Sequence, residues 1–159
     1  MKKLDNRQLE SILQFRNEDI ISRFSDMYRL DINEVNDIFD ETLKFLFISQ
    51  IPGVFIPDDL LIIDEMWHNM ILFTPQYHEF SKQYFDTPYF HHIPASKNEK
   101  DERKREMVKN PEKTKKEYLQ KLEFLLSVTY DYLGEETVEK WFREYATKYS
   151  KEQIKALRR

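Results

Sequence analysis

The chain contains no cysteine, and this absence excludes several classes of protein. Disulfide-stabilised folds, cysteine-ligated zinc fingers, iron–sulfur clusters and thiolate nucleophiles all need a sulfur that the sequence lacks. Any metal site must therefore use histidine, aspartate, glutamate, backbone oxygen or water.

Glycine is almost as scarce, with two residues in 159, and long apolar runs are missing. The longest apolar run, around 43–48, is far shorter than the roughly 20 residues that cross a bilayer. The N-terminus lacks the apolar core of a signal peptide. We therefore expect no membrane association and a cytoplasmic location. The sequence also lacks a His-Glu-x-x-His motif, a glycine-rich phosphate loop and a Gly-x-Ser-x-Gly elbow.

What the sequence does contain is a helical hydrophobic period along nearly its whole length. No segment alternates between apolar and polar residues for long enough to predict a strand. The pattern predicts a compact all-α bundle of about six to eight helices, and the length is typical of a single domain over residues 1–159. The residues expected in one shared core are Leu43, Leu46, Ile63, Trp67, Leu122 and Leu126.

Helix starts are marked by capping residues and prolines. Asp31 followed by Glu34 is a capping box, which predicts a helix to about residue 50. Prolines suit the first turn of a helix, so Pro57, Pro75 and Pro111 predict helices to about residues 73, 85 and 133. The apolar residues expected on the inner face of the last of these helices are Leu119, Leu122, Leu125, Leu126, Thr129 and Leu133.

Charge is divided unevenly between the two parts of the chain. Residues 1–96 carry 8 basic and 16 acidic residues, a net charge of −8, whereas residues 97–159 carry 17 and 13, a net charge of +4. The acidic part disfavours phosphate backbones, so we do not expect nucleic-acid binding. Residues 97–116 interleave both signs and predict a charged connector or an exposed helix, with a phosphate or partner contact as the alternative.

All four histidines lie between Asp64 and Pro94. In a helix over residues 57–73, Asp64 and His68 are one turn apart and share a narrow polar arc with Glu65. Three interpretations of this pair are open. The two side chains can form a local hydrogen bond, they can make half of a metal site, or Asp64 can orient His68 for proton transfer.

A third ligand has several candidates. The short hinge at Thr74 turns the next helix back, which can bring His78 towards His68. His91 and His92 are adjacent on an extended segment, so one of them can reach the site while the other faces solvent. The predicted metal ligands are therefore Asp64, His68 and His92, with His78 and His91 as alternates. The expected ion is one divalent zinc or iron, with Glu65 or His78 as a candidate general base.

These residues also carry a resemblance to a known group of proteins. The pattern over residues 55–95 resembles the uncharacterised bacterial proteins related to plant glycine-rich domain-containing proteins, and it consists of Asp64, Trp67-His68, Thr74, Tyr77, Phe80, His92 and Pro94. The resemblance implies a small helical domain with an Asp, Trp-His and late His constellation of unsettled role. The plant relatives are associated with stress and development and carry glycine-rich extensions, which this chain lacks.

The resemblance also draws attention to Ser81, which stands where many relatives have a cysteine. If that cysteine is a metal ligand in the relatives, a serine hydroxyl replaces it poorly here, and the metal interpretation is weakened.

Two functions follow from these observations. The first is a helical binding or adaptor module with a protein partner, in which His68 bonds to Asp64 beside an aromatic core. The missing catalytic motifs favour this function. The alternative is a metal-dependent, hydrolase-like enzyme that uses Asp64, His68 and His92.

Overall fold

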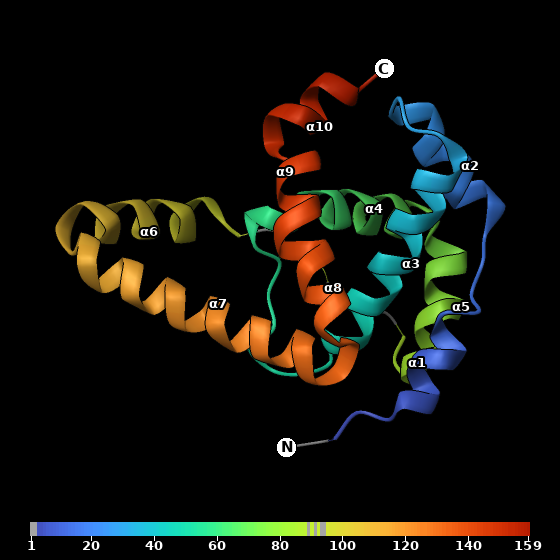
Figure 1. Cartoon of the computed structure of the whole chain (residues 1–159), viewed down its shortest axis with the longest axis horizontal. Helices are drawn as coiled ribbons and strands as arrows, with labels where there is room; N and C mark the ends of the chain where they lie inside the picture. The colour runs from blue at the N-terminus through green and yellow to red at the C-terminus, as the bar shows by residue number, and fades with distance from the viewer. Residues whose placement is uncertain (1–2, 89, 91, 93–94) are drawn as a thin grey trace.

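The computed structural model describes residues 3–88, 90, 92 and 95–159, and these residues confirm the all-α class (Figure 1). No β-strand occurs among them, although an isolated bridge joins Tyr28 to Arg158. The elements are α1 (Asn6–Ile12), α2 (Glu18–Met27), α3 (Ile32–Ile48), η1 (Asp58–Leu60), α4 (Leu61–Leu72), α5 (Thr74–Phe85), α6 (Lys97–Lys109), α7 (Pro111–Leu133), α8 (Glu135–Glu139), η2 (Lys140–Tyr145), α9 (Ala146–Lys148) and α10 (Lys151–Leu157).

The helix starts follow the signals in the sequence. Asp31 accepts a hydrogen bond from the backbone N–H of Glu34, and Glu34 accepts one from the N–H of Asp31, so the capping box is confirmed. Pro111 opens α7, and Pro75 lies in the first turn of α5. The segment after Pro57 begins as the 3₁₀ turn η1 before it continues as α4.

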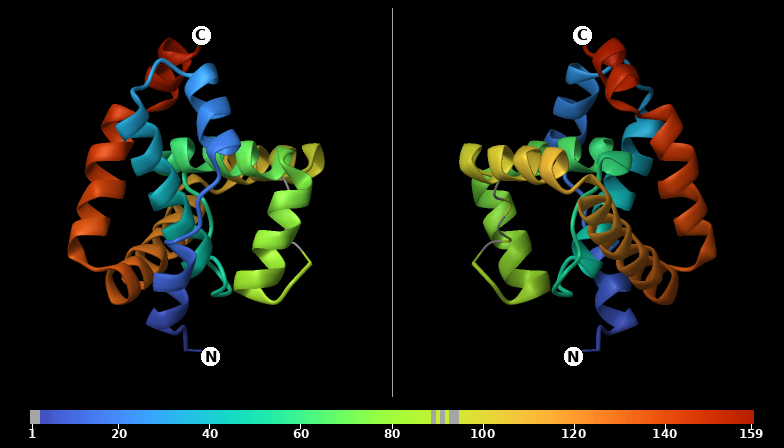
Figure 2. Two further views of the ribbon diagram at one scale, coloured as in Figure 1. Left: turned by 90° about the vertical axis from the view of Figure 1, so that its right-hand side faces the viewer. Right: turned by 90° about the vertical axis from the view of Figure 1, so that its left-hand side faces the viewer.

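The core is built around α3, which packs against α1, α2, α4 and α7 (Figures 1 and 2). Four of the six expected core residues are buried: Leu43, Leu46, Ile63 and Trp67. Phe45 on α3 contacts the rings of both Trp67 and Trp141. The other two expected core residues are only half-buried. Leu122 packs against the core, whereas Leu126 does not belong to the core cluster that the described residues form.

The charged segment 97–116 forms an exposed helix, α6, followed by the first turns of α7. Figure 1 shows the two helices as a hairpin that extends from the body at the left, with α6 and α7 diverging from their turn. Within this described segment, α6 buries none of its residues. Its mixed charges are therefore solvated.

The C-terminal part forms a continuous helical column, from α8 through η2 to α9, beside α3. Its middle section, η2, is a π-helix. Glu41 on α3 accepts hydrogen bonds from the Trp141 indole at 2.6 Å and from Lys140 at 3.1 Å. Asp37, one turn earlier on α3, binds Lys140 and the hydroxyl of Tyr145.

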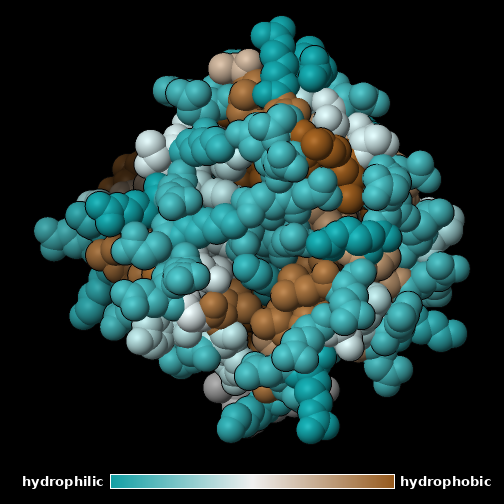
Figure 3. All heavy atoms as spheres, turned by 45° about the vertical axis from the view of Figure 1, so that its right-hand side comes forward, coloured by the Kyte–Doolittle hydropathy of each residue, from teal (hydrophilic) through white to brown (hydrophobic). Residues whose placement is uncertain are grey.

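The surface is largely hydrophilic. On the face drawn in Figure 3, hydrophobic side chains gather in separate areas with hydrophilic side chains between them. Within the part of the chain that the structure describes, no helix combines the length and apolar character of a membrane span.

Candidate metal centre

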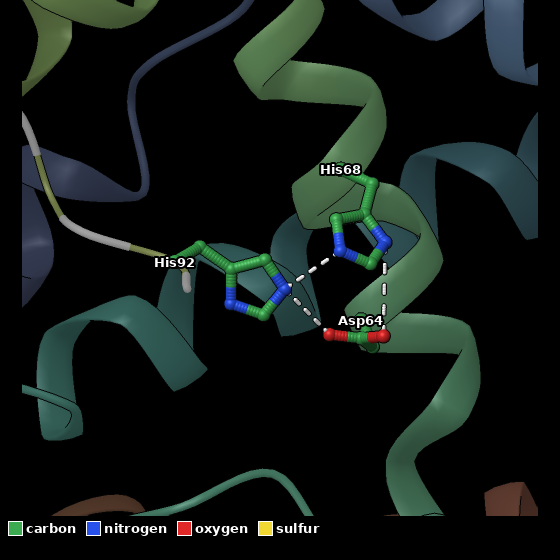
Figure 4. A group of neighbouring side chains, drawn as sticks. All are labelled: Asp64, His68 and His92. Atoms are coloured by element: carbon green, nitrogen blue, oxygen red, sulfur yellow. Dashed lines mark hydrogen bonds and ion pairs between the residues drawn. The ribbon is translucent and has the colours of Figure 1, made fainter. Parts of the chain in front are cut away.

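The site begins with two side chains on one face of α4. Asp64 and His68 lie one helical turn apart, and His68 Nδ1 is 3.7 Å from Asp64 Oδ2 (Figure 4). A spacing of four residues directs both side chains to the same side of a helix. The predicted juxtaposition of the carboxylate and the imidazole is therefore present.

His92 reaches the same site from the segment between α5 and α6. Its Nε2 atom lies 2.8 Å from Asp64 Oδ1 and 2.9 Å from His68 Nε2 (Figure 4). One potential ligand atom from each of the three residues falls within 4.8 Å of the others. The structure thus brings together the three residues that the sequence analysis selected first.

The facing nitrogens limit what can occupy the site. Each imidazole nitrogen carries either a proton or a lone pair. Nε2 of His68 and Nε2 of His92 face each other at hydrogen-bond distance, so their lone pairs would repel unless one nitrogen carries a proton or both bind the same cation. The carboxylate of Asp64 adds a negative charge at the same point, which favours a positive occupant.

The ring of Trp67 packs against the ring of His92. The indole stacks on the imidazole with 4.1 Å between ring centroids. Trp67 Nε1 also donates a hydrogen bond to the hydroxyl of Tyr77 at 2.9 Å. The hydroxyl of Tyr77 donates in turn to the carbonyl of Phe90 at 2.7 Å, two residues before His92. This chain of bonds links α4 and α5 to the backbone that carries the third ligand.

Burial affects the chemistry of Tyr77. Because the side chain is buried, its neutral form is favoured, and the hydrogen bond from Trp67 opposes this only in part. Burial therefore raises the pKa of Tyr77 to about 12. Tyr77 is therefore a neutral hydrogen-bond donor to Phe90 at physiological pH.

Ser81 fixes the same segment from α5. It is fully buried, donates to the carbonyl of Tyr77 at 2.8 Å and accepts from the backbone N–H of Phe90 at 3.3 Å. Its hydroxyl is thus engaged by the backbone of α5 and of the segment that carries His92. The weakening of the metal interpretation by the missing cysteine stays a prediction from the resemblance.

The alternates and the candidate base lie elsewhere. His78 is exposed on α5 and does not belong to the group of ligands, while His91 lies outside the described residues. Glu65 accepts a hydrogen bond from the Tyr28 hydroxyl at 2.8 Å and pairs with Arg158 at 3.5 Å. Its carboxylate is engaged by α2 and the C-terminus, because it lies 100° further round α4 than Asp64.

The contact with Glu65 also affects Tyr28. Burial, together with the hydrogen bond to the Glu65 carboxylate, raises the pKa of Tyr28 to about 12. The pair is a structural contact between α2 and α4.

The site has a buried side and an open side. The side chain of His92 is 15% exposed, whereas that of His68 is 50% exposed. Water can therefore reach the cluster from the side of His68, while Trp67 covers one face of the His92 ring. Such a position suits an ion that keeps some of its water ligands.

The supporting residues were not predicted as part of the site. In the sequence, Tyr77 stood out only as part of the family resemblance, and Ser81 only as a lost ligand. The spacing of Tyr77 and Ser81, four residues apart on α5, puts both on one face. That spacing was the available signal, but the partner backbone at Phe90 has no sequence signature.

Fold and site together define a class, which is an all-α domain with a partly exposed Asp-His-His cluster. Two of its residues lie on α4, and the third lies on the segment after α5. The model of the UCP032817-like family matches residues 7–116. This range covers more than half of the chain and includes all three candidate ligands, so the chain belongs to the UCP032817-like family. No curated protein sequence and no solved structure matches the chain.

Proposed function

We propose that this protein binds one divalent metal ion, Zn²⁺ or Fe²⁺, through Asp64, His68 and His92. The observation that carries the proposal is the position of His92 Nε2, within 2.9 Å of potential ligand atoms of both other residues. A local hydrogen bond between Asp64 and His68 would not require a second histidine at this point.

The donor set fits these two ions. Catalytic zinc sites use three protein ligands of this kind, and two histidines with one carboxylate are also the facial ligand set of non-haem iron(II). In a tetrahedral zinc site with bonds of about 2.0 Å, ligand atoms are roughly 3.3 Å apart. Separations of 2.8 and 2.9 Å need only a small opening to admit the ion.

A hydrolytic role is a second candidate, and the exposure of His68 supports it. A zinc ion with three protein ligands keeps one position for water, and this water is acidified by the metal. Glu65 is held by Tyr28 and Arg158, so we do not assign it as the base. We therefore propose metal binding and a water molecule bound to the metal, and we assign no general base.

The adaptor function is supported by a different part of the molecule. The exposed hairpin of α6 and α7 carries large apolar side chains on its surface, among them Met107, Val108 and Leu119. Exposed apolar residues on a helical projection are typical of protein contacts. Metal binding and protein binding involve separate surfaces, so the two functions are compatible. The cytoplasmic location and the relationship to plant glycine-rich domain-containing proteins stay predictions from the sequence.

The test is metal content after purification without a metal-affinity column. We expect about one zinc or iron per chain by elemental analysis, or calorimetric uptake of one equivalent after treatment with a chelator. His68→Ala should abolish uptake and leave a folded helical protein. His78→Ala is the matched control, because it removes an exposed histidine outside the cluster, and it should bind like the wild type.

Two results would overturn the proposal. One is a wild-type protein that holds no metal and takes up neither zinc nor iron(II) under anaerobic titration. The other is equal loss of binding in His68→Ala and His78→Ala, since this would place the ion elsewhere.

A further inference from the structure

The long helix α7 has two apolar faces, and only one of them contacts the core. Leu125, Val128 and Thr129 are buried on the inner face. On the outer face, Leu119 is 50% exposed and Tyr130 is 58% exposed. Leu126 is half-buried, and it does not belong to the core cluster that the described residues form. The single inner face that the sequence predicted is thus wrong for Leu119 and Leu126.

The outer residues form a regular stripe. At 100° per residue, Leu126 and Tyr130 both fall within about 20° of Leu119 around the helix. Their spacings of seven and four residues are those of a helix–helix seam. We call this stripe of Leu119, Leu126 and Tyr130 the outer seam. In Figure 1, α7 forms the lower left edge of the molecule, where a second helix could approach.

Charge along the outer side of the molecule changes sign near the middle of the helix. Residues 111–121 contain four lysines and two glutamates, whereas residues 123–139 contain five acidic residues and no basic residue. All of these charged side chains are exposed. The first turns of α7 are therefore positive, and the end of α7 together with α8 is negative.

The charges of α7 and α8 complement those of a second copy that runs in the opposite direction. If two copies of α7 lie side by side in opposite directions, the positive part of each faces the negative part of the other. A two-fold axis uses the same surface on both subunits and satisfies both charge contacts at once. A parallel arrangement would instead place like charges together, which is destabilising.

We infer that the outer seam binds a second copy of this chain, through an antiparallel α7–α7 contact in a two-fold symmetric dimer. Burial of the seam removes Leu119 and Tyr130 from water, and the flanking charges fix the direction of the contact. The inference is independent of the metal centre, which involves α4 and the segment after α5.

The first experiment measures mass in solution by light scattering coupled to size exclusion. The wild type should be a dimer at micromolar concentration and should dissociate at high salt. Leu119→Glu should be monomeric. Leu72→Glu is the matched control, because Leu72 is an exposed leucine on α4, and it should leave the dimer intact. Circular dichroism should show that both variants keep the helical content of the wild type.

Charge reversal tests the direction of the contact. One variant carries Lys115→Glu and Lys116→Glu, which makes the first part of α7 negative. The other carries Asp131→Lys, Glu135→Lys and Glu136→Lys, which changes the net charge of residues 123–139 from −5 to +1. Each variant alone should be a monomer, because an antiparallel contact between two copies of it would place like charges opposite each other at both charge contacts. An equimolar mixture of the two should restore a dimer, because opposite charges then meet at both contacts.

Three results would overturn the inference. A wild type that is monomeric at 100 µM would exclude the second copy as the occupant, even if another protein bound the outer seam. A dimer unaffected by Leu119→Glu would place the interface elsewhere. Charge-reversed variants that stay monomeric when mixed would exclude the antiparallel arrangement.

Discussion

Trp67 connects the core to the candidate metal centre through three different contacts. Its ring packs against Phe45 of α3 and stacks on His92, and its N–H donates a hydrogen bond to the Tyr77 hydroxyl. The side chain is 6% exposed. A single residue therefore contributes to both the stability of the bundle and the position of a ligand.

Replacing Trp67 with Ala should lower the free energy of unfolding by about 3 to 5 kcal/mol, the usual range for a large buried aromatic residue. Chemical denaturation gives the value directly. Val108→Ala, on the exposed surface of α6, should change it by less than about 0.5 kcal/mol. A loss below about 1 kcal/mol for Trp67→Ala would show that the indole does not belong to the core.

Tyr77 makes the stability of the protein depend on alkaline pH. Its pKa is about 12 in the folded state against 10.0 for the free side chain, so the folded state holds the proton more tightly. The contribution is complete below pH 10 and is lost as the pH rises towards 12. By pH 11 the loss should reach roughly 1 kcal/mol.

The measurement compares wild type with Tyr77→Phe in urea at pH 8 and pH 11. At pH 8 the variant should be less stable by about 1 kcal/mol, because two hydrogen bonds to the hydroxyl are lost. At pH 11 the two proteins should differ less. A difference that stays constant with pH would mean that Tyr77 is not the group responsible.

At the scale of elements, the C-terminal column is held on α3 by polar groups in an otherwise apolar contact. The side chain of Glu41 is 2% exposed and accepts bonds from Trp141, Lys140 and Lys44. Burial by itself would lower the pKa of Lys140, but hydrogen bonds and charges from Asp37 and Glu41 outweigh this and raise it. The lysine therefore stays charged, and its carboxylate partners stay paired.

Replacing Glu41 with Ala should cost about 2 to 4 kcal/mol, because it leaves the indole N–H of Trp141 and part of the charge of Lys140 without partners. Thermal or chemical unfolding can measure this loss. Glu139→Ala removes an exposed ion pair with Arg143 in the same column and should cost less than about 0.5 kcal/mol. Equal costs for the two variants would contradict a buried network.

The elements were predictable where the signal is local. The capping box at Asp31 and the prolines at positions 75 and 111 act within one helical turn, so their neighbours in sequence decide the outcome. The π-helix η2 was not predictable. Its side chains bond to Asp37 and Glu41, about a hundred residues earlier in the chain, and these partners have no local sequence signal.

The sequence could likewise predict one part of the candidate site and not the other. Asp64 and His68 were predictable as a pair because the helix fixes their spacing, and His92 followed from the concentration of histidines. The contacts of Glu65 were not predictable, because Tyr28 and Arg158 approach it from distant parts of the sequence. For α7, periodicity marked the apolar residues but could not show which of them the core would cover.

For the whole molecule, a bound metal should stabilise the folded state. At a free concentration one hundred times the Kd, the gain is about 2.7 kcal/mol. For a protein of this size this corresponds to a rise in Tm of roughly 5 to 10 °C. Differential scanning fluorimetry with zinc and with anaerobic iron(II) would detect it.

Asp64→Asn provides the control for this measurement, because it keeps the shape of the side chain but removes the charge that attracts the cation. We expect its Tm to respond little to either metal. A rise in Tm as large as that of the wild type would show that Asp64 is not a ligand.

The return of His92 to α4 also closes the chain on itself. The contact with His68 spans 24 residues and encloses all of α5. A covalent cross-link of that span would reduce the conformational entropy of the unfolded chain by an amount worth about 3 to 4 kcal/mol. In a chain that has no cysteine, an ion held by α4 and His92 would act as such a cross-link, one that a chelator can remove and a metal salt can restore.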